Sequence, residues 1–403
     1  MSKLHGILNR NTTGYTTGGF KLRSLISFEL FKLFKRRKNI AGIVALIVLI
    51  LIYIFTSIGM EKSRYATDIS LCKDDIQSNE SMIKSTDTPK ETVKLLSKHV
   101  SLVKTELKAL DNGDWKTFLK AKIQDNNNKI SEINNDSLIS GDNPDELKAE
   151  NRKYQYLLNN NIKPIYENCN TQAFNFLKNV LTDIMPIIML ILLFLISADI
   201  VSNEAEGGSL RLLLVQPVSR SKIIFSKFAA SVIYCFSVII FIFGTFFVIL
   251  GLTRGFGSAY YPISFNNNCF LTFFNARDVS VSIIPLYAFL LLSVPILILL
   301  IIATVSFSLL FSTIFNSSAT SISLLIILTV AVYVFLNRFN ILKPAAPILF
   351  FLYTNIPGLL DGTISKSMHL NSITYTCGVI VFILYTIICY ATSSFIFNKK
   401  DIH

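Results

Sequence analysis

This chain of 403 residues has few charged side chains and few residues of the kinds that build catalytic or metal centres. Only 16% of its positions are Asp, Glu, Lys or Arg, whereas soluble proteins carry about a quarter. Its four histidines are scattered, at His5, His99, His369 and His403. No CxxC pair, GxxxxGK[ST] phosphate loop, HExxH motif or GxSxG motif occurs. We therefore expect neither an enzyme nor a resident metal or cofactor, and any ATP would have to be bound by another protein.

Apolar residues, in contrast, are abundant: they make up 51% of the chain and include 32 phenylalanines. Six apolar runs are close to the ~20 residues that a helix needs to cross the hydrocarbon core of a membrane. They lie at 39–59, 180–201, 229–252, 282–311, 319–337 and 373–397. The hydropathy pattern thus predicts an all-α integral membrane protein with six transmembrane helices.

The positions of Lys and Arg predict how these helices are oriented. Residues 1–38 contain nine Lys or Arg and one acid, Glu29. With the N-terminus inside, the short inner segments carry fifteen basic residues and the short outer connections carry five. Both termini are therefore expected to be cytoplasmic. The charge lies beside an apolar span without interleaved aromatic stacking residues, so we expect anionic lipid as its partner and not nucleic acid.

Residues 1–38 form a cytoplasmic arm before the first span, 39–59. A helical wheel places Leu22, Ile26, Leu30, Leu33 and Phe34 on one face, and Lys21, Glu29, Lys32, Lys35 and Arg36 on the other. This pattern predicts an amphipathic helix lying in the inner membrane interface. A purely positive anchor is the alternative.

Residues 60–178 form the long polar segment between the first two spans, with 18 basic and 18 acidic side chains. Helix starts are indicated at Thr88-Pro89 and at Asn143-Pro144. A helical-hairpin ectodomain is predicted here, and a disordered polar loop is the alternative. A hairpin would bring Cys72 and Cys169 close together, so they could form a disulfide, or remain as two free thiols.

Two acids lie within the apolar runs: Asp183 near the outer end of the second span, and Asp199 at its inner edge. Intramembrane acids are candidates for functional polar residues. Both are close enough to an interface to be hydrated instead.

The segment 202–228 connects the second and third spans and contains "EAEGGSLRLLLVQPVSRSKIIFSKF". It is too charged for lipid and too apolar for water, which indicates a protein partner. It resembles the signature connection of permease subunits in type-2 ABC (ATP-binding cassette) exporters, with Ser209 and Gln216 as mild departures. The matching residues are Glu204 or Glu206, Gly208, Leu212, Leu213, Pro217, Ser219, Arg220 and Lys227.

The resemblance implies that this connection couples the permease to a cytoplasmic ABC ATPase, which would use ATP and Mg²⁺. The residues implied in coupling are Glu204, Glu206, Gly208, Arg211, Leu213, Pro217 and Arg220. The six-span layout, the basic N-terminal helix and the lysine-ending tail extend the resemblance over the whole chain. It implies a five-helix transmembrane domain over residues 179–403, with an outer re-entrant segment at 341–362 broken by Pro344, Pro347 and Pro357. The segment 60–178 resembles the ectodomain of a subset of the family.

A second permease half, identical or different, is a further implied partner, together with membrane lipids. The spans suit a hydrophobic or amphipathic cargo: an antimicrobial peptide or bacteriocin, a drug, or a lipid-like molecule. The Asn, Lys and Ile richness is compatible with the plasma membrane of a low-GC bacterium. The alternatives are a membrane receptor or sensor whose ectodomain binds a ligand, and a secondary transporter. The chain shows no inverted repeat and few membrane acids to support the latter.

Overall fold

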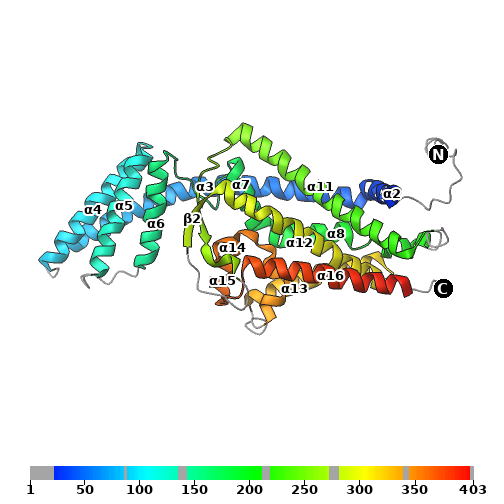
Figure 1. The fold of residues 1–403 in the computed structure, drawn as a ribbon. Helices are drawn as coiled ribbons and strands as arrows, with labels where there is room; N and C mark the ends of the chain where they lie inside the picture. Colours follow the sequence, from blue (N-terminus) through cyan, green and yellow to red (C-terminus); the bar gives the residue numbers. More distant parts are fainter. Residues whose placement is uncertain are drawn as a thin grey trace.

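The computed structural model describes residues 22–85, 89–134, 143–210, 218–271, 281–338 and 345–399. The molecule is elongated, and most of its helices run along its length (Figure 1). Helix α3 (Arg37–Lys84) passes through the whole bundle and continues beyond it, where the helices of residues 90–159 lie against it. We call these the outer helices, and the end of the bundle beside them the outer end, as labels of position in the molecule. Helix α2 (Leu22–Lys35) and the C-terminal end of α16 (Tyr375–Lys399) lie at the end of the molecule opposite that group.

Among the described residues, six helical segments are long and apolar enough to cross a membrane, which confirms the six predicted spans by length and composition. Five are single helices: α3, α11 (Arg220–Arg254), α12 (Leu286–Ile314), α13 (Ser318–Arg338) and α16 (Tyr375–Lys399). The second span is composite: α7 (Ala173–Asn179), η2 (Val180–Met189), α8 (Leu190–Ser197) and α9 (Ser202–Glu206).

The second span is the central element of the bundle. Its apolar window is 72% buried inside the protein, whereas the other five windows are 17% to 44% buried. Its middle part, η2, is a π-helix that contains Pro186. Proline has no N–H and cannot complete the ordinary α-helical hydrogen-bond ladder, so a wider local turn is a natural response. The second span is therefore held by its neighbours and not by lipid.

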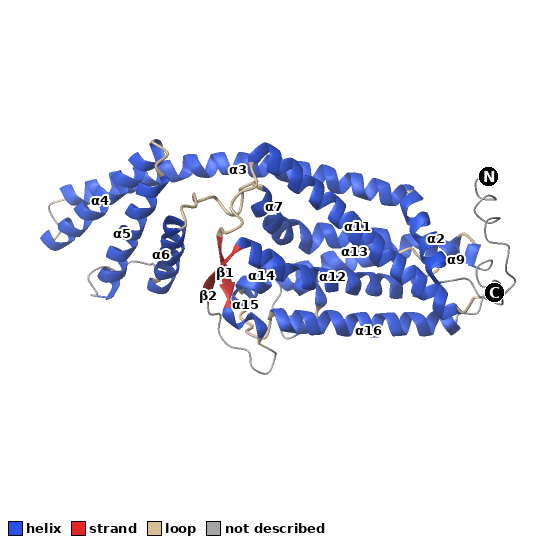
Figure 2. Ribbon diagram, turned by 45° about the horizontal axis from the view of Figure 1, so that its top comes forward, coloured by secondary structure: helices blue, strands red, loops and turns tan. Residues whose placement is uncertain are grey.

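Two short strands correct the all-α prediction. β1 (Pro262–Asn266) pairs antiparallel with β2 (Val281–Pro285), with Ser264 opposite Ile283. They lie between α6 and α14 at the outer end of the bundle (Figure 2). Residues 282–285, assigned to the fourth span from hydropathy, belong to β2, because a run of Val and Ile suits a strand as well as a helix.

The segment between the first two spans has more helices than the predicted hairpin. Helix α3 does not end at the membrane: it extends to Lys84 and packs against α4 (Lys90–Asp111). Helix α5 (Trp115–Asn134) packs on α4, and α6 (Pro144–Asn159) packs on α5. The predicted start of α6 is confirmed, since the Asn143 side chain accepts a hydrogen bond from the Asp145 N–H. Thr88 lies outside the described residues.

The structure leaves Cys72 and Cys169 as free thiols, so the disulfide hypothesis is corrected. Asn170, beside Cys169, donates a hydrogen bond to Glu61 of α3 at 3.0 Å. Cys72 lies eleven residues further along that helix, a rise of about 16 Å. A disulfide needs the two Cα atoms within about 7 Å. The hypothesis failed because α3 carries Cys72 past the base of the outer helices.

His99 joins three outer helices through a charged cluster. Its Nδ1 lies 2.6 Å from Asp125 Oδ1 in α5, and its Nε2 lies 2.9 Å from Asp75 Oδ2 in α3. The hydrogen bond with Asp125 is the main cause that raises the pKa of His99 above its ordinary value. Burial favours a protonated Asp125, yet His99 and Lys129 hold the pKa of that carboxyl below its usual range. The cluster is therefore strongest when His99 is protonated and Asp125 is ionised.

We expect the outer helices to lose stability as the pH rises above about 6.5, the ordinary pKa of a histidine side chain. The stabilisation from a raised histidine pKa is complete below about 6.5 and is lost as the pH passes the folded-state pKa. The Asp125 contribution is lost only in acid, below about pH 4, and does not interfere. Urea unfolding followed by the fluorescence of Trp115, the one tryptophan of the chain and part of α5, measures the effect. His99→Gln should abolish this pH dependence; an unchanged slope would refute the assignment.

Residues 345–368 pack as short helices against the outer ends of the spans. They include η6 (Phe350–Thr354), α14 (Ile356–Asp361) and α15 (Thr363–Met368). Phe350, Tyr353 and Ile356 are fully buried, which suits irregular backbone beside a membrane bundle. Residues 341–344 of the predicted re-entrant segment, Pro344 included, lie outside the described residues. A further one-turn helix, η3 (Asn267–Phe270), follows β1.

Candidate functional site

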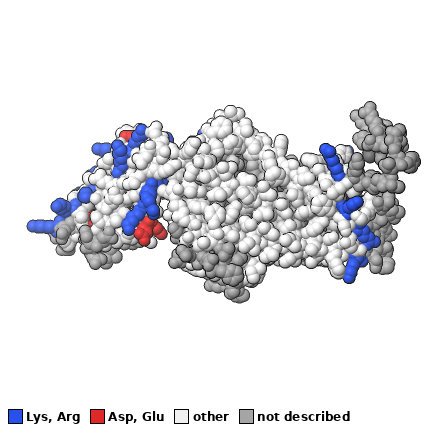
Figure 3. Space-filling view, in the orientation of Figure 1, with Lys and Arg blue, Asp and Glu red and all other residues white. Residues whose placement is uncertain are grey.

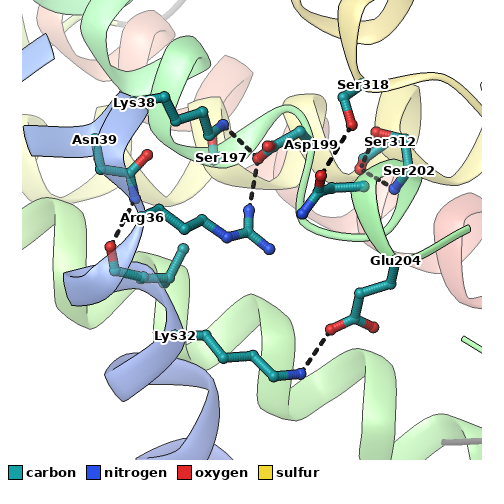
Figure 4. A network of polar contacts seen from close by, with 12 residues as sticks. Lys32, Arg36, Lys38, Asn39, Ser197, Asp199, Ser202, Glu204, Ser312 and Ser318 are labelled. Atoms are coloured by element: carbon teal, nitrogen blue, oxygen red, sulfur yellow. Dashed lines mark hydrogen bonds and ion pairs between the residues drawn. The ribbon is translucent and has the colours of Figure 1, made fainter. Parts of the chain in front are cut away.

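A buried cluster of four charges joins the N-terminal helix to both ends of the 202–228 connection. Lys227, in the second turn of α11, is completely buried, and its Nζ lies 3.0 Å from Glu29 Oε1 and 2.6 Å from Glu204 Oε2. Glu29 belongs to α2 (Leu22–Lys35), and Glu204 belongs to α9. Lys32 of α2 completes the cluster: its Nζ lies 2.8 Å from Glu204 Oε1 (Figure 4). The same Nζ lies 3.5 Å from Glu29 Oε1.

The positive and negative charges in this cluster balance, two of each. Breaking a buried ion pair by removing one partner costs about 3–5 kcal/mol, because the other charge stays buried without compensation. The Lys32 side chain is 30% exposed, so the cluster opens to solvent on that side only. We infer that α2, α9 and the start of α11 are held together as one unit.

A second set of ion pairs holds the inner edge of the second span. Asp199 Oδ1 lies 2.8 Å from Arg36 Nη1 and 2.5 Å from Lys38 Nζ, at the junction of α2 and α3 (Figure 4). Lys38 also donates to the backbone oxygen of Leu195 at 2.7 Å, near the C-terminal end of α8. Cations are favourable at the C-terminal end of a helix, where carbonyl groups lack partners. The basic α2–α3 junction therefore stabilises the end of α8.

Serine side chains tie the same edge to the fourth span. Ser312 Oγ accepts hydrogen bonds from the N–H groups of Val201 and Ser202, at 2.9 and 3.1 Å (Figure 4). Ser308 donates to Ser197 Oγ at 2.6 Å. The two bonds to Ser312 satisfy backbone N–H groups that the break between α8 and α9 would leave unpaired.

The acids predicted from the connection have different surroundings. Glu204, one of the residues implied in coupling, is buried in the charge cluster and so is not exposed for contact with an ATPase. Glu206 is exposed and accepts a hydrogen bond from the Ser318 N–H at 2.8 Å, so it caps α13. Arg220, at the start of α11, donates to the Asn398 backbone oxygen at 2.8 Å near the C-terminal end of α16.

Gly208 has a φ of 69°, a left-handed conformation that glycine adopts without strain, directly after α9. The chain turns sharply there. Arg211, Leu213 and Pro217 lie outside the described residues. The remaining predicted polar residue, Asp183, is at the other end of the second span, where it accepts a hydrogen bond from Tyr53 Oη at 2.6 Å.

The arm helix α2 has its polar and apolar faces arranged differently from the prediction. Glu29 and Leu33 face inward and are buried, whereas Phe28, Phe31 and Phe34 are exposed. The helical wheel places Glu29 on the polar face of the arm and the motif includes Lys227, but neither pattern predicts that the two side chains pair. One acid among nine basic residues, and a lysine within an apolar helix start, were signals of a buried ion pair.

Six apolar spans define a multi-pass integral membrane protein. At one end of the bundle, buried ion pairs join the N-terminal helix α2 to the second and third spans. The chain belongs to the ABC-2 family of transporters: the sequence model described as "ABC-2 family transporter protein" matches residues 29–402. No curated protein matches this sequence closely enough to count as a relative. The chain is thus the membrane permease component of a transporter and not the catalytic one, and permeases of this family generally pair with ATPase subunits.

Proposed function

We propose that this chain is the permease of an ATP-driven exporter, in which the 202–228 connection docks on a cytoplasmic ABC ATPase that binds and hydrolyses Mg-ATP. The observation that carries the proposal is the buried cluster of Glu29, Lys32, Glu204 and Lys227. It joins α2 to both sides of the connection. A push on the connection would therefore move α2 and the second and third spans together.

The charge distribution supports an orientation with both termini in the cytoplasm and α4–α6 outside. On the face drawn in Figure 3, a band of Lys and Arg lies near the end of the molecule that carries the termini. A long uncharged zone separates this band from the charged outer helices. Basic residues at one end of an apolar zone are typical of the cytoplasmic side. The outer helices would then form the large ectodomain of an exporter subset.

The proposed cargo is hydrophobic or amphipathic, such as an antimicrobial peptide, a drug or a lipid-like molecule. The spans offer Phe, Leu and Ile with buried Ser and Thr, and within the described residues they carry few acids. A second permease half would complete the pathway, and the plasma membrane of a bacterium is the proposed location.

The test is capture of the tagged permease from its native host in mild detergent, followed by mass spectrometry of the proteins that accompany it. A Leu213→Asp/Arg220→Glu variant is captured in parallel, because these substitutions change one apolar and one basic residue of the connection that the family resemblance implies in coupling. We expect an ABC ATPase to be captured with the wild type and lost by at least about tenfold from the variant.

The matched control is Leu252→Asp/Arg254→Glu, which makes the same changes at the other end of α11. It should keep the ATPase, provided that both variants elute as monodisperse protein. An ATPase captured equally with all three proteins would disprove the docking role of the connection. A histidine kinase in place of an ATPase would indicate a sensor.

A further inference from the structure

A large polar cleft lies between the outer helices and the outer end of the membrane bundle. Its volume is about 810 Å³, and α6, the end of the second span, the β1–β2 pair and α14–α15 line it. Figure 2 shows the strands between α6 and α14, at the point where the outer helices meet the bundle. A second hollow of about 600 Å³ adjoins it and shares Arg152, Glu146 and Ser264 as lining residues.

Most of the acids that line this cleft have partners within the protein. Glu167 forms ion pairs with Lys153 and, at 3.7 Å, with Lys178. Asp361 accepts hydrogen bonds from the N–H and hydroxyl of Thr363, both at 2.8 Å. Burial raises the pKa of the Asp361 carboxyl, so its negative charge is less favoured and it attracts a cation less strongly. Asp145 pairs with Lys148 on the outer surface.

The cations on the rim do not have such partners. Arg152 on α6 and Lys366 on α15 both line the cleft. Neither forms an ion pair with any residue that the structure describes. The floor adds Lys178, whose one pairing with Glu167 is loose. Arg152 and Lys366 therefore face one space from two elements, whereas Lys178 already has Glu167 as a partner. Guanidinium and ammonium groups bind phosphate oxygens strongly.

Two further features of the cleft, an acidic acceptor and an apolar wall, indicate what else a ligand would carry. Asp183 lies in the cleft with a single hydrogen bond, from Tyr53, and can accept a bond from an amine. Ile263, Val281, Phe289 and Pro357 form an apolar part of the wall, and Phe289 belongs to the first turn of the α12 span. The cleft thus lies at the level where apolar spans give way to polar structure. That is where the head group of an amphiphile lies when its chains are in the membrane.

We propose that this cleft binds the zwitterionic head group of a phosphate-bearing amphiphile, with Arg152 and Lys366 on the phosphate and Asp183 on an adjacent amine. The source of the head group is a lipid of the surrounding membrane or an amphiphilic cargo; the chemistry recognised is the same. The inference goes beyond the export proposal and does not depend on it, because binding requires neither an ATPase nor transport.

The experiment is native mass spectrometry of the detergent-purified protein titrated with short-chain dihexanoyl lipids. Phosphatidylethanolamine carries both groups, phosphatidylglycerol lacks the amine, and inorganic phosphate lacks the chains. We expect tightest binding of phosphatidylethanolamine, and at least about tenfold weaker binding by Arg152→Gln/Lys366→Gln, since each loses a charged hydrogen bond. Lys94→Gln/Lys108→Gln, at two exposed positions of α4, is the charge-matched control and should bind like the wild type.

Urea unfolding followed by the fluorescence of Trp115 shows that the variants are folded if their transitions match that of the wild type. Equal binding of phosphatidylethanolamine by the wild type and the cleft variant would overturn the site. Equal affinity for phosphatidylglycerol would overturn the amine assignment to Asp183. If inorganic phosphate bound as tightly as the lipid, the cleft would be a site for a free anion and not for an amphiphile, and the proposal would be overturned.

Discussion

Replacing Lys227 by Met should destabilise the inner end of this protein by about 3–5 kcal/mol, the cost of leaving a buried charge without its partner. The Lys227 side chain is fully buried between Glu29 and Glu204. Without it, two carboxylates share the single cation of Lys32. We expect a lower temperature of thermal unfolding and less monodisperse protein, measured by heating detergent-solubilised samples before size-exclusion chromatography.

The second substitution Glu204→Gln should restore most of the stability that Lys227→Met removes. It takes away the unbalanced charge and leaves the Lys32–Glu29 pair, which are 3.5 Å apart. Such a double-mutant cycle isolates the coupling between the two residues. Lys222→Met is the matched control, because Lys222 is on the exposed face of the same helix. If Lys222→Met and Lys227→Met were equally stable, or if Glu204→Gln made the single variant worse, the buried cluster would not be the stabilising element.

The same variants connect stability to transport. Under the proposed function, α2 moves with the second and third spans because the cluster joins them. Lys227→Met should then reduce the transport-linked stimulation of the ATPase more than it reduces ATPase capture. Capture depends on the 202–228 surface, whereas stimulation depends on the rigid link behind that surface. The difference between the two readouts separates docking from transmission.

Hydropathy was sufficient to predict the six spans, and the physical reason is simple. A backbone in lipid must satisfy its own hydrogen bonds, so an apolar run of about 20 residues has few alternatives to a helix. The Asn143 cap of α6 could likewise be read locally, because an Asn before Pro at a helix start is a strong signal. These features depend on neighbouring residues only.

The features that sequence analysis missed depend on residues far apart in the chain. Glu29 and Lys227 are 198 positions apart, and no local pattern specifies that they pair. The β1–β2 pair was hidden because β2 continues directly into an apolar helix. The start of α5, in contrast, does have a local sequence signal. Gly113 has a φ of 68°, and Asp114 accepts a hydrogen bond from the Thr117 N–H, so Asn112-Gly113-Asp114 ends one helix and begins the next.

Lys122→Met should destabilise the outer helices by about 2–3 kcal/mol near neutral pH, because it removes the partner of a buried charge. The loss is smaller than at Lys227, since the Lys122 side chain is 34% exposed and solvent screens the pair. Glu106 of α4 is buried, with 1% of its side chain exposed, and Lys122 Nζ of α5 lies 2.9 Å from its Oε2. Burial raises the pKa of Glu106, and Lys122 acts in the opposite direction. Without Lys122 the carboxylate loses its nearest cation and keeps only the weaker influence of Lys129, so its pKa should rise further.

This prediction has a pH dependence whose sign can be worked out. An acid with a raised folded-state pKa destabilises the fold when ionised, and the penalty shrinks as falling pH protonates it. The loss in Lys122→Met should therefore be large at about pH 7.5 and smaller at about pH 5, and Glu106→Gln should remove it at both. Urea unfolding read by Trp115, on the same helix as Lys122, measures each case. Lys120→Met changes an exposed lysine on that helix and should have little effect at either pH. A loss in Lys122→Met that does not change with pH would mean that α4 and α5 are held by apolar packing, with the Glu106 charge contributing nothing.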